Sequence, residues 1–138
     1  MKKNIIIAIL IIVGSIVFLK INSEYDIGFN PTTRSGVQIG WIEHSGSDYI
    51  SSKYTKFSGS LSKKIKFNEG DVVTFHHESE VKDGKLSIVL LDSEGKTILE
   101  FEPDKKDEVI EITKSGKYTV KVIGEDTKGS FNINWEVE

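Results

Sequence analysis

One short segment of the sequence, His76 to Glu80, concentrates side chains that can bind a metal ion or transfer a proton. It reads His-His-Glu-Ser-Glu, and imidazole and carboxylate groups are common ligands of zinc and other transition metals. Because alternate residues of an extended strand share a face, His76, Glu78 and Glu80 are expected on one face and His77 on the other. The segment therefore indicates either a metal site or a solvated polar face of a strand.

A metal site on this segment needs a further ligand, and His44 is the candidate elsewhere in the sequence. Nothing in the sequence places His44 close to His76, and the segment lacks the helical histidine pair and the cysteine spacing of common zinc motifs. We favour the solvated face, with His77 as an inward, hydrogen-bonded histidine. The alternative is a metal-dependent enzyme or metal-binding protein that uses His44, His76, Glu78 and Glu80.

No other pattern in the sequence indicates catalysis or a cofactor. Gly95-Lys96-Thr97 resembles the end of a phosphate-binding loop, but Leu90 stands where that loop requires glycine. The sequence has no cysteine and no Gly-x-Ser-x-Gly motif, which argues against thiol chemistry and against a serine hydrolase. The acidic turn 92–95 offers oxygens to calcium, but acidic residues are also common turn formers. We therefore assign no catalytic residue and no cofactor.

Charge divides the chain into two parts. Lys2, Lys3 and Lys20 flank an apolar run, whereas all 21 acidic residues lie after it. Residues 22–138 carry 15 basic and 21 acidic side chains, a net charge of −6. Because nucleic-acid binding depends mainly on neutralising phosphates with Lys and Arg, we do not expect a nucleic-acid partner.

The N-terminal segment has the composition of a signal sequence, with a basic start followed by the apolar run 5–19. This run spans about 22 Å as a helix, somewhat less than the hydrocarbon core of a bilayer. Only Ser23 offers a small residue near a cleavage position. We expect residues 1–21 to be an uncleaved single-pass signal anchor, residues 22–35 a tether and residues 36–138 an extracellular domain. Secretion after signal cleavage is the alternative.

Beyond the tether, apolar and polar residues alternate, most clearly where Phe131, Ile133 and Trp135 are separated by polar neighbours. Turn signals such as Asp83-Gly84 separate the alternating segments. The predicted strands lie near 36–44, 49–58, 61–67, 71–79, 85–92, 96–102, 107–113, 117–124 and 130–137. The fold class is therefore all-β, an antiparallel β-sandwich or jelly roll of about 8–9 strands, preceded by one N-terminal hydrophobic helix.

An apolar segment, a cluster of lysines and the two tryptophans allow further predictions. The segment from Leu86 to Leu91 is almost entirely apolar, which predicts an internal strand covered on both faces. Lys63, Lys64 and Lys66 are typical of a sheet edge, where lysines discourage pairing with other chains. A ligand-binding patch is the alternative for these lysines. Both tryptophans are expected in the core rather than as a carbohydrate platform.

Residues 57–138 contain an ordered set of short turn and strand motifs. The set is Phe57-Ser58-Gly59, Gly70-Asp71, Gly84-Lys85-Leu86, Asp92 to Lys96, Gly116-Lys117-Tyr118 and Gly129-Ser130-Phe131 to Trp135. In this order the segment resembles small exported, uncharacterised β-sandwich proteins of clostridia and bacilli, and more loosely the pre-peptidase C-terminal type of domain. The resemblance implies a β-sandwich outside the cell that carries no catalytic motif.

The sequence thus predicts a non-catalytic, membrane-anchored extracellular module for binding or interaction. It would contact the membrane through residues 5–19, and its partner would be an envelope component or another exported protein.

Overall fold

The computed structural model describes residues 32–138, so the predicted N-terminal helix and most of the predicted tether lie outside the described residues. Within residues 32–138 there are seven strands, and all of them pair antiparallel. They are β1 (Thr33–Ile39), β2 (Ile42–Ser45), β3 (Tyr49–Phe67), β4 (Val72–Leu91), β5 (Thr97–Glu100), β6 (Asp107–Glu111) and β7 (Gly116–Val137). β1 thus begins inside the range predicted as tether. The described part of the chain contains no helix with the length and apolar character that a membrane crossing requires.

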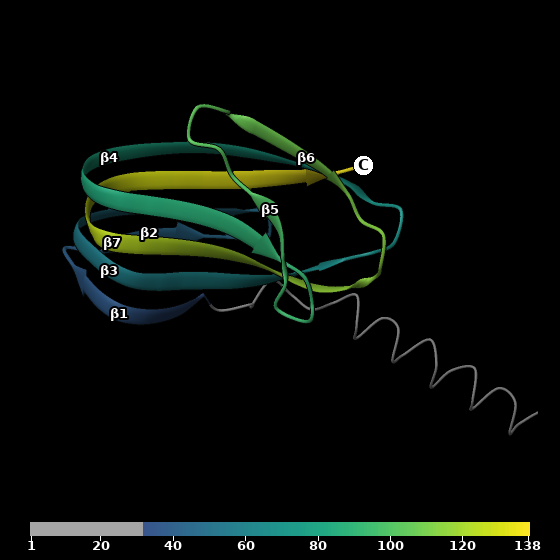
Figure 1. Ribbon diagram of the computed structural model, residues 1–138, viewed down its shortest axis with the longest axis horizontal. Coiled ribbons are helices and arrows are strands. Elements are labelled where there is room, and N and C mark those ends of the chain that lie inside the picture. Colours follow the sequence, from purple (N-terminus) through teal and green to yellow (C-terminus); the bar gives the residue numbers. More distant parts are fainter. Residues whose placement is uncertain (1–31) are drawn as a thin grey trace, which may run out of the picture.

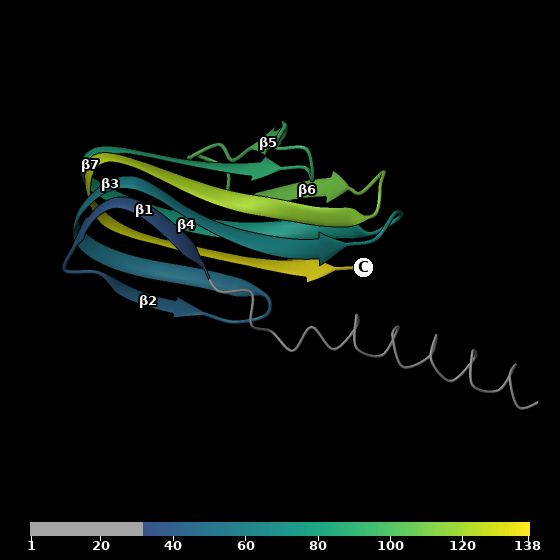
Figure 2. The ribbon, with the colours of Figure 1, turned by 90° about the horizontal axis from the view of Figure 1, so that it is seen from below.

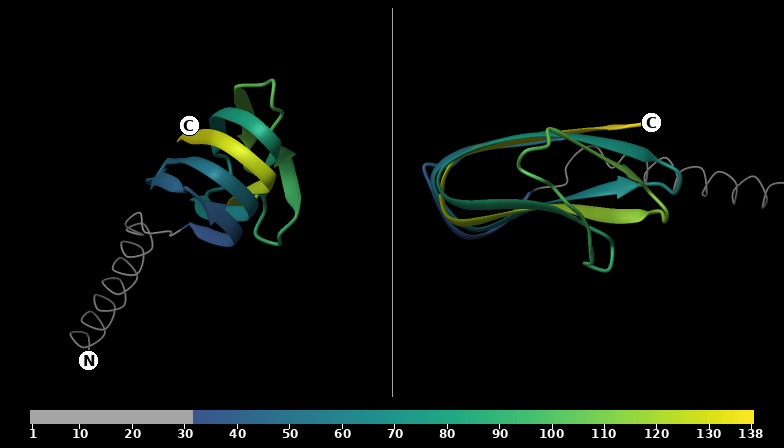
Figure 3. Two further views of the ribbon diagram at one scale, coloured as in Figure 1. Left: turned by 90° about the vertical axis from the view of Figure 1, so that its left-hand side faces the viewer. Right: turned by 45° about the horizontal axis from the view of Figure 1, so that its top comes forward.

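Three long strands, β3, β4 and β7, determine the architecture, because each one bends and runs through both layers of a sandwich (Figure 1 and Figure 3). The β1 layer consists of β1, β5 and the segments 60–67 of β3, 85–91 of β4 and 116–124 of β7. The β2 layer consists of β2, β6 and the segments 49–54 of β3, 72–81 of β4 and 129–137 of β7. β1 and β2 therefore lie along one edge of the sandwich, and β5 and β6 along the other (Figure 2).

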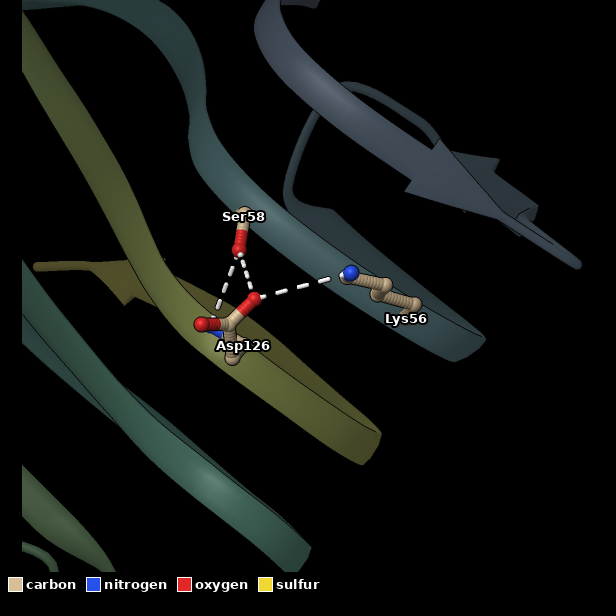
Figure 4. A network of polar contacts seen from close by, with 3 residues as sticks. All are labelled: Lys56, Ser58 and Asp126. Atoms are coloured by element: carbon tan, nitrogen blue, oxygen red, sulfur yellow. Dashed lines mark hydrogen bonds and ion pairs between the residues drawn. The ribbon is translucent and has the colours of Figure 1, made fainter.

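The long strands bend where glycine allows a close approach of two backbones. Gly129 of β7 has a φ of 151°, and a Cβ there would lie 1.7 Å from the carbonyl oxygen of Glu80. A small polar network joins the bends of β3 and β7: the Ser58 hydroxyl donates to Asp126 Oδ1 over 2.9 Å and accepts from the Asp126 N–H over 2.9 Å (Figure 4). Lys56 Nζ lies 3.7 Å from the same carboxylate oxygen. These contacts tie the two bends together.

The core lies between the two layers and is built from the inward residues of the alternating strands. Phe67 of the β1 layer meets Phe75 of the β2 layer edge to face, with ring centroids 6.3 Å apart. Trp135 is buried next to Phe75, with 4% of its surface exposed. Trp41 is half-buried and stacks on Tyr54, with ring centroids 5.4 Å apart. Both tryptophans therefore belong to the core or pack against it, as predicted.

Most of the predicted strands correspond to parts of the observed ones. β3 joins the predicted strands 49–58 and 61–67, and β4 and β7 each join two predicted strands in the same way. Conversely, the predicted strand 36–44 is divided into β1 and β2 near Gly40, which has a φ of 63°. The segment 85–91 pairs with β7, and its last three residues, 89–91, also pair with β5, so the predicted internal position is confirmed for 89–91. The outward side chains Val89 and Leu91 are half-buried, so the expected cover on both faces is not found.

Candidate functional site

A groove of about 670 Å³ crosses the outer face of the β2 layer. Short polar side chains form its floor, among them Ser51 of β3 and Asn132 of β7. His44 of β2 lines one end, and Lys106, which precedes β6, lines the other. The groove therefore runs across the strands, from one edge of the sandwich toward the other.

Strand alternation explains why polar side chains reach this face. In β7, Phe131 and Ile133 are buried, and Asn132 between them is exposed. The pairing register then aligns the outward residues of neighbouring strands in rows. One row is His44, Ser51, Asn132 and Glu78, and the next is Ile42, Lys53, Ser130 and Glu80.

The groove offers hydrogen-bonding groups that no other residue in the described range 32–138 uses. Ser51, Ser130 and Asn132 make no side-chain hydrogen bond with any other described residue. Hydroxyl and amide groups both donate and accept hydrogen bonds. A ligand in the groove would therefore meet several free donors and acceptors at positions fixed by the sheet.

The formal charges that line the groove balance each other. The lysines are Lys53 and Lys106, and the carboxylates are Glu78 and Glu80. Lys106 Nζ lies 3.5 Å from Glu78 Oε1, and this ion pair joins β4 to the segment before β6. Glu80 in turn lies 3.8 Å from Nζ of Lys82. Because most of these charges are paired, the groove favours no ligand of either sign.

The structure places the four candidate metal ligands on one face but does not bring them together. His76, Glu78 and Glu80 project from the outer face of β4, as alternation predicts. His44 lies in the same row as Glu78, but β3 and β7 separate their strands, a backbone distance of about 14 Å at about 4.8 Å per strand. Within residues 32–138, no three His, Asp or Glu side chains form a group that could hold a metal ion.

His76 has a partner that sequence reasoning missed. Its Nδ1 lies 2.5 Å from Oδ1 of Asp107 in β6. The two side chains meet because β6 pairs with β4 in the register that sets His76 opposite Asp107. They line a smaller hollow of about 230 Å³ on the same outer face. The residues are 31 positions apart, so local periodicity carries no signal for this contact, and only the strand order reveals it.

His77 is the inward histidine, with 5% of its surface exposed. Its ring packs against Phe101, with centroids 5.0 Å apart. The expected hydrogen bond of the ring is not found, since Nε2 is buried without a partner among the described residues. Burial lowers the pKa of His77, and the carboxylates of Glu108 and Asp107 oppose this shift. The His77 ring is therefore part of the core.

Lys63 departs from the prediction of a lysine-rich sheet edge. Only 3% of its surface is exposed, because it shares the inward face of β3 with buried residues such as Ile65 and points between the layers. Its Nζ donates a hydrogen bond to the carbonyl oxygen of Gly46. Burial lowers the pKa of Lys63, whereas Glu43 and Asp48 act in the opposite direction. Lys63 is thus an interior polar residue, apart from the groove.

Comparison with known proteins yields a distant likeness in fold. No protein-family model and no curated protein sequence matches the chain. The periplasmic lysozyme inhibitor PliG of Aeromonas hydrophila is similar with a TM-score of 0.45 and 12% identity, over 73% of this chain and 89% of that one. A carbohydrate-binding module of Cellvibrio mixtus lichenase 5A is similar with a TM-score of 0.35 and 14% identity, over 77% and 93%. The xylan-binding domain of Paenibacillus barcinonensis Xyn10C has a TM-score of 0.38 and 9% identity, over 80% and 86%.

These likenesses are between β-sandwiches and assign neither a family nor a ligand. The resemblance of residues 57–138 to the pre-peptidase C-terminal type of domain stays a prediction, because no family model matches the chain.

Proposed function

We propose that residues 32–138 form a non-catalytic binding module whose ligand lies in the groove on the outer face of the β2 layer. The observation that carries the proposal is the set of polar side chains without a partner among the described residues, Ser51, Ser130 and Asn132. Paired antiparallel strands hold these groups in place. A ligand therefore binds without the entropy loss of ordering a flexible loop.

The chemistry of the groove favours an uncharged ligand rich in hydrogen-bonding groups, such as a glycan chain of the cell envelope. Its lysines and glutamates balance, so a strongly charged ligand gains little net attraction. Ile42 and Pro103 add apolar surface to the lining, against which the C–H groups of a sugar can pack. The length of the groove across several strands suits an extended chain rather than a compact molecule.

A substitution that fills the groove tests this proposal. Full-length protein in neutral detergent is titrated with soluble glycan fragments of a Gram-positive cell wall, and binding is measured by calorimetry. In Ser51→Arg a long charged side chain occupies the floor, and we expect affinity to fall at least about tenfold, or about 1.4 kcal/mol. Thr97→Arg places the same side chain at an exposed position of β5 and should bind like the parent. Equal binding by both variants would contradict the assignment of the groove.

We also propose that residues 1–21 hold this module outside the cell membrane, with the apolar run 5–19 in the bilayer. The basic residues before the run and the weak cleavage signal after it support this placement. The partner would then be an envelope component or another exported protein.

A further inference from the structure

The smaller hollow on the outer face of the β2 layer lies beside the groove. It encloses about 230 Å³, and Asn134 of β7 forms part of its lining. Three side chains that line the groove also line the hollow, namely Glu78, Lys106 and Asn132. The hollow is therefore a side branch of the groove, and a substituent on a ligand in the groove can enter it.

The charged groups in the hollow are already paired with each other. Nδ1 of His76 lies 2.5 Å from Oδ1 of Asp107, and Nζ of Lys106 lies 3.5 Å from Oε1 of Glu78. A charged substituent would have to compete with these pairs for a partner. The hollow therefore favours an uncharged substituent.

Two asparagines of β7 supply the polar groups that remain. Neither Asn132 nor Asn134 makes a side-chain hydrogen bond with another residue in the range 32–138. Both point outward, because their neighbours Phe131, Ile133 and Trp135 are buried. A carboxamide carries N–H donors and a carbonyl acceptor, so each asparagine can both donate and accept a hydrogen bond.

The spacing of the two asparagines favours an amide over a hydroxyl. Asn132 and Asn134 are two residues apart on one strand, which separates their Cα atoms by about 6.8 Å. A hydroxyl that donates to one partner and accepts from another joins atoms at most about 5.6 Å apart. A secondary amide joins atoms up to about 8 Å apart, because its N–H and C=O point in opposite directions. An amide therefore bridges the two side chains, whereas a hydroxyl would have to draw them together.

On the basis of the glycan site proposed for the groove, on which this selectivity depends, we propose that the hollow holds the N-acyl group of an amino sugar. The sugar ring lies in the groove, and the protein selects glycans whose sugars are N-acetylated. The acyl carbonyl accepts a hydrogen bond from the carboxamide of one asparagine, and the acyl N–H donates to the carbonyl of the other. The group is uncharged, which suits the paired charges of the hollow.

Two hexasaccharides test the proposal, because they share one linkage and differ only in one substituent of each sugar, an N-acetyl group or a hydroxyl. Full-length protein in a polyoxyethylene detergent, which carries no sugar, is titrated with each by calorimetry. We expect the parent to bind the N-acetylated chain at least about fivefold more tightly. In Asn134→Ala this preference should fall below about twofold, while the hydroxyl chain still binds within about twofold of the parent. Asn68→Ala removes the same carboxamide from an exposed position after β3, outside the groove and the hollow, and should keep the full preference.

The results separate this proposal from the proposed function. If the parent binds both chains equally, or if Asn134→Ala keeps the preference, the hollow does not select an N-acyl group, although the groove remains a glycan site. An equal loss of preference in Asn134→Ala and Asn68→Ala would also contradict the role of Asn134. If cell-wall fragments bind but neither hexasaccharide does, the glycan site stands and the selectivity is wrong. If the parent binds none of these glycans, both proposals are wrong.

Discussion

His77 and Lys63 carry basic side chains inside the sandwich, and burial lowers the pKa of each. Lys63 donates a hydrogen bond to Gly46, whereas Nε2 of His77 has no partner among the described residues. A buried polar atom without a hydrogen bond destabilises the folded state by about 1–3 kcal/mol. His77 is therefore the residue at which pH should act most directly on stability.

We expect the melting temperature to fall as the pH drops below about 6.5, and His77→Leu to reduce that fall. Because the pKa of His77 is lowered in the folded protein, the unfolded chain binds the proton more readily. The stability linked to His77 is thus present above the unfolded pKa and is lost as the pH falls toward the folded pKa. Scanning calorimetry between about pH 7.5 and about pH 5 measures this dependence. His44→Gln, at an exposed position, is the control, and an unchanged acid dependence in His77→Leu would contradict the prediction.

At the scale of single residues, the alternation of apolar and polar residues predicted which face a side chain occupies, but not which residue it contacts. It placed His77 inward and His76 outward, and both directions are confirmed. It did not predict that Asp107 would contact His76, because that contact depends on the register of β6 against β4. The same alternation indicates that Lys63 points into the core, because Ile65, two residues later, is buried on the same side.

Among the elements, β7 has the most extensive role, because it pairs with β3 on one side and β4 on the other in both layers. Its second half, 129–137, brings Phe131, Ile133 and Trp135 into the core. Each such side chain contributes about 1.5–3 kcal/mol by burial. Their sum is comparable with the total stability of about 5–15 kcal/mol expected of a domain.

We therefore expect truncation after Lys128 to unfold the domain, and Trp135→Ala to lower its stability by about 3–5 kcal/mol. Val137→Ala is the control, because half of the Val137 surface is already exposed and its loss should matter little. Circular dichroism and thermal melts compare the variants with the parent. A truncated protein that melts cooperatively at the parent temperature would show that the second half of β7 is dispensable.

The elements also show why the sequence predicted most strand positions but not their continuity. Glycine signals such as Gly84 and Gly129 are typical of turns between strands, and here they lie at bends within β4 and β7. Both situations need the same backbone freedom, so composition does not separate them. The groove could not be predicted from the sequence, because its rows contain residues of four strands that only the strand order brings together.

For the whole molecule, the proposed membrane anchor leads to one prediction about processing. With only Ser23 as a small residue near a cleavage position, we expect the mature protein to keep residues 1–21 and to sediment with membranes. The intact mass of protein isolated from the native cell measures this directly. A mature chain that starts near Asn22 or Glu24, free in the medium, would show instead that the segment is a cleaved signal peptide.

The passage of β3, β4 and β7 through both layers has a mechanical consequence. Since every long strand belongs to both layers, neither layer can rotate or slide without breaking hydrogen bonds in the other. The outer faces are then the two sides of one stiff body, separated by the two packed sheets, whose backbones lie about 10 Å apart. A glycan in the groove would therefore be held at a constant distance from the opposite face of the domain.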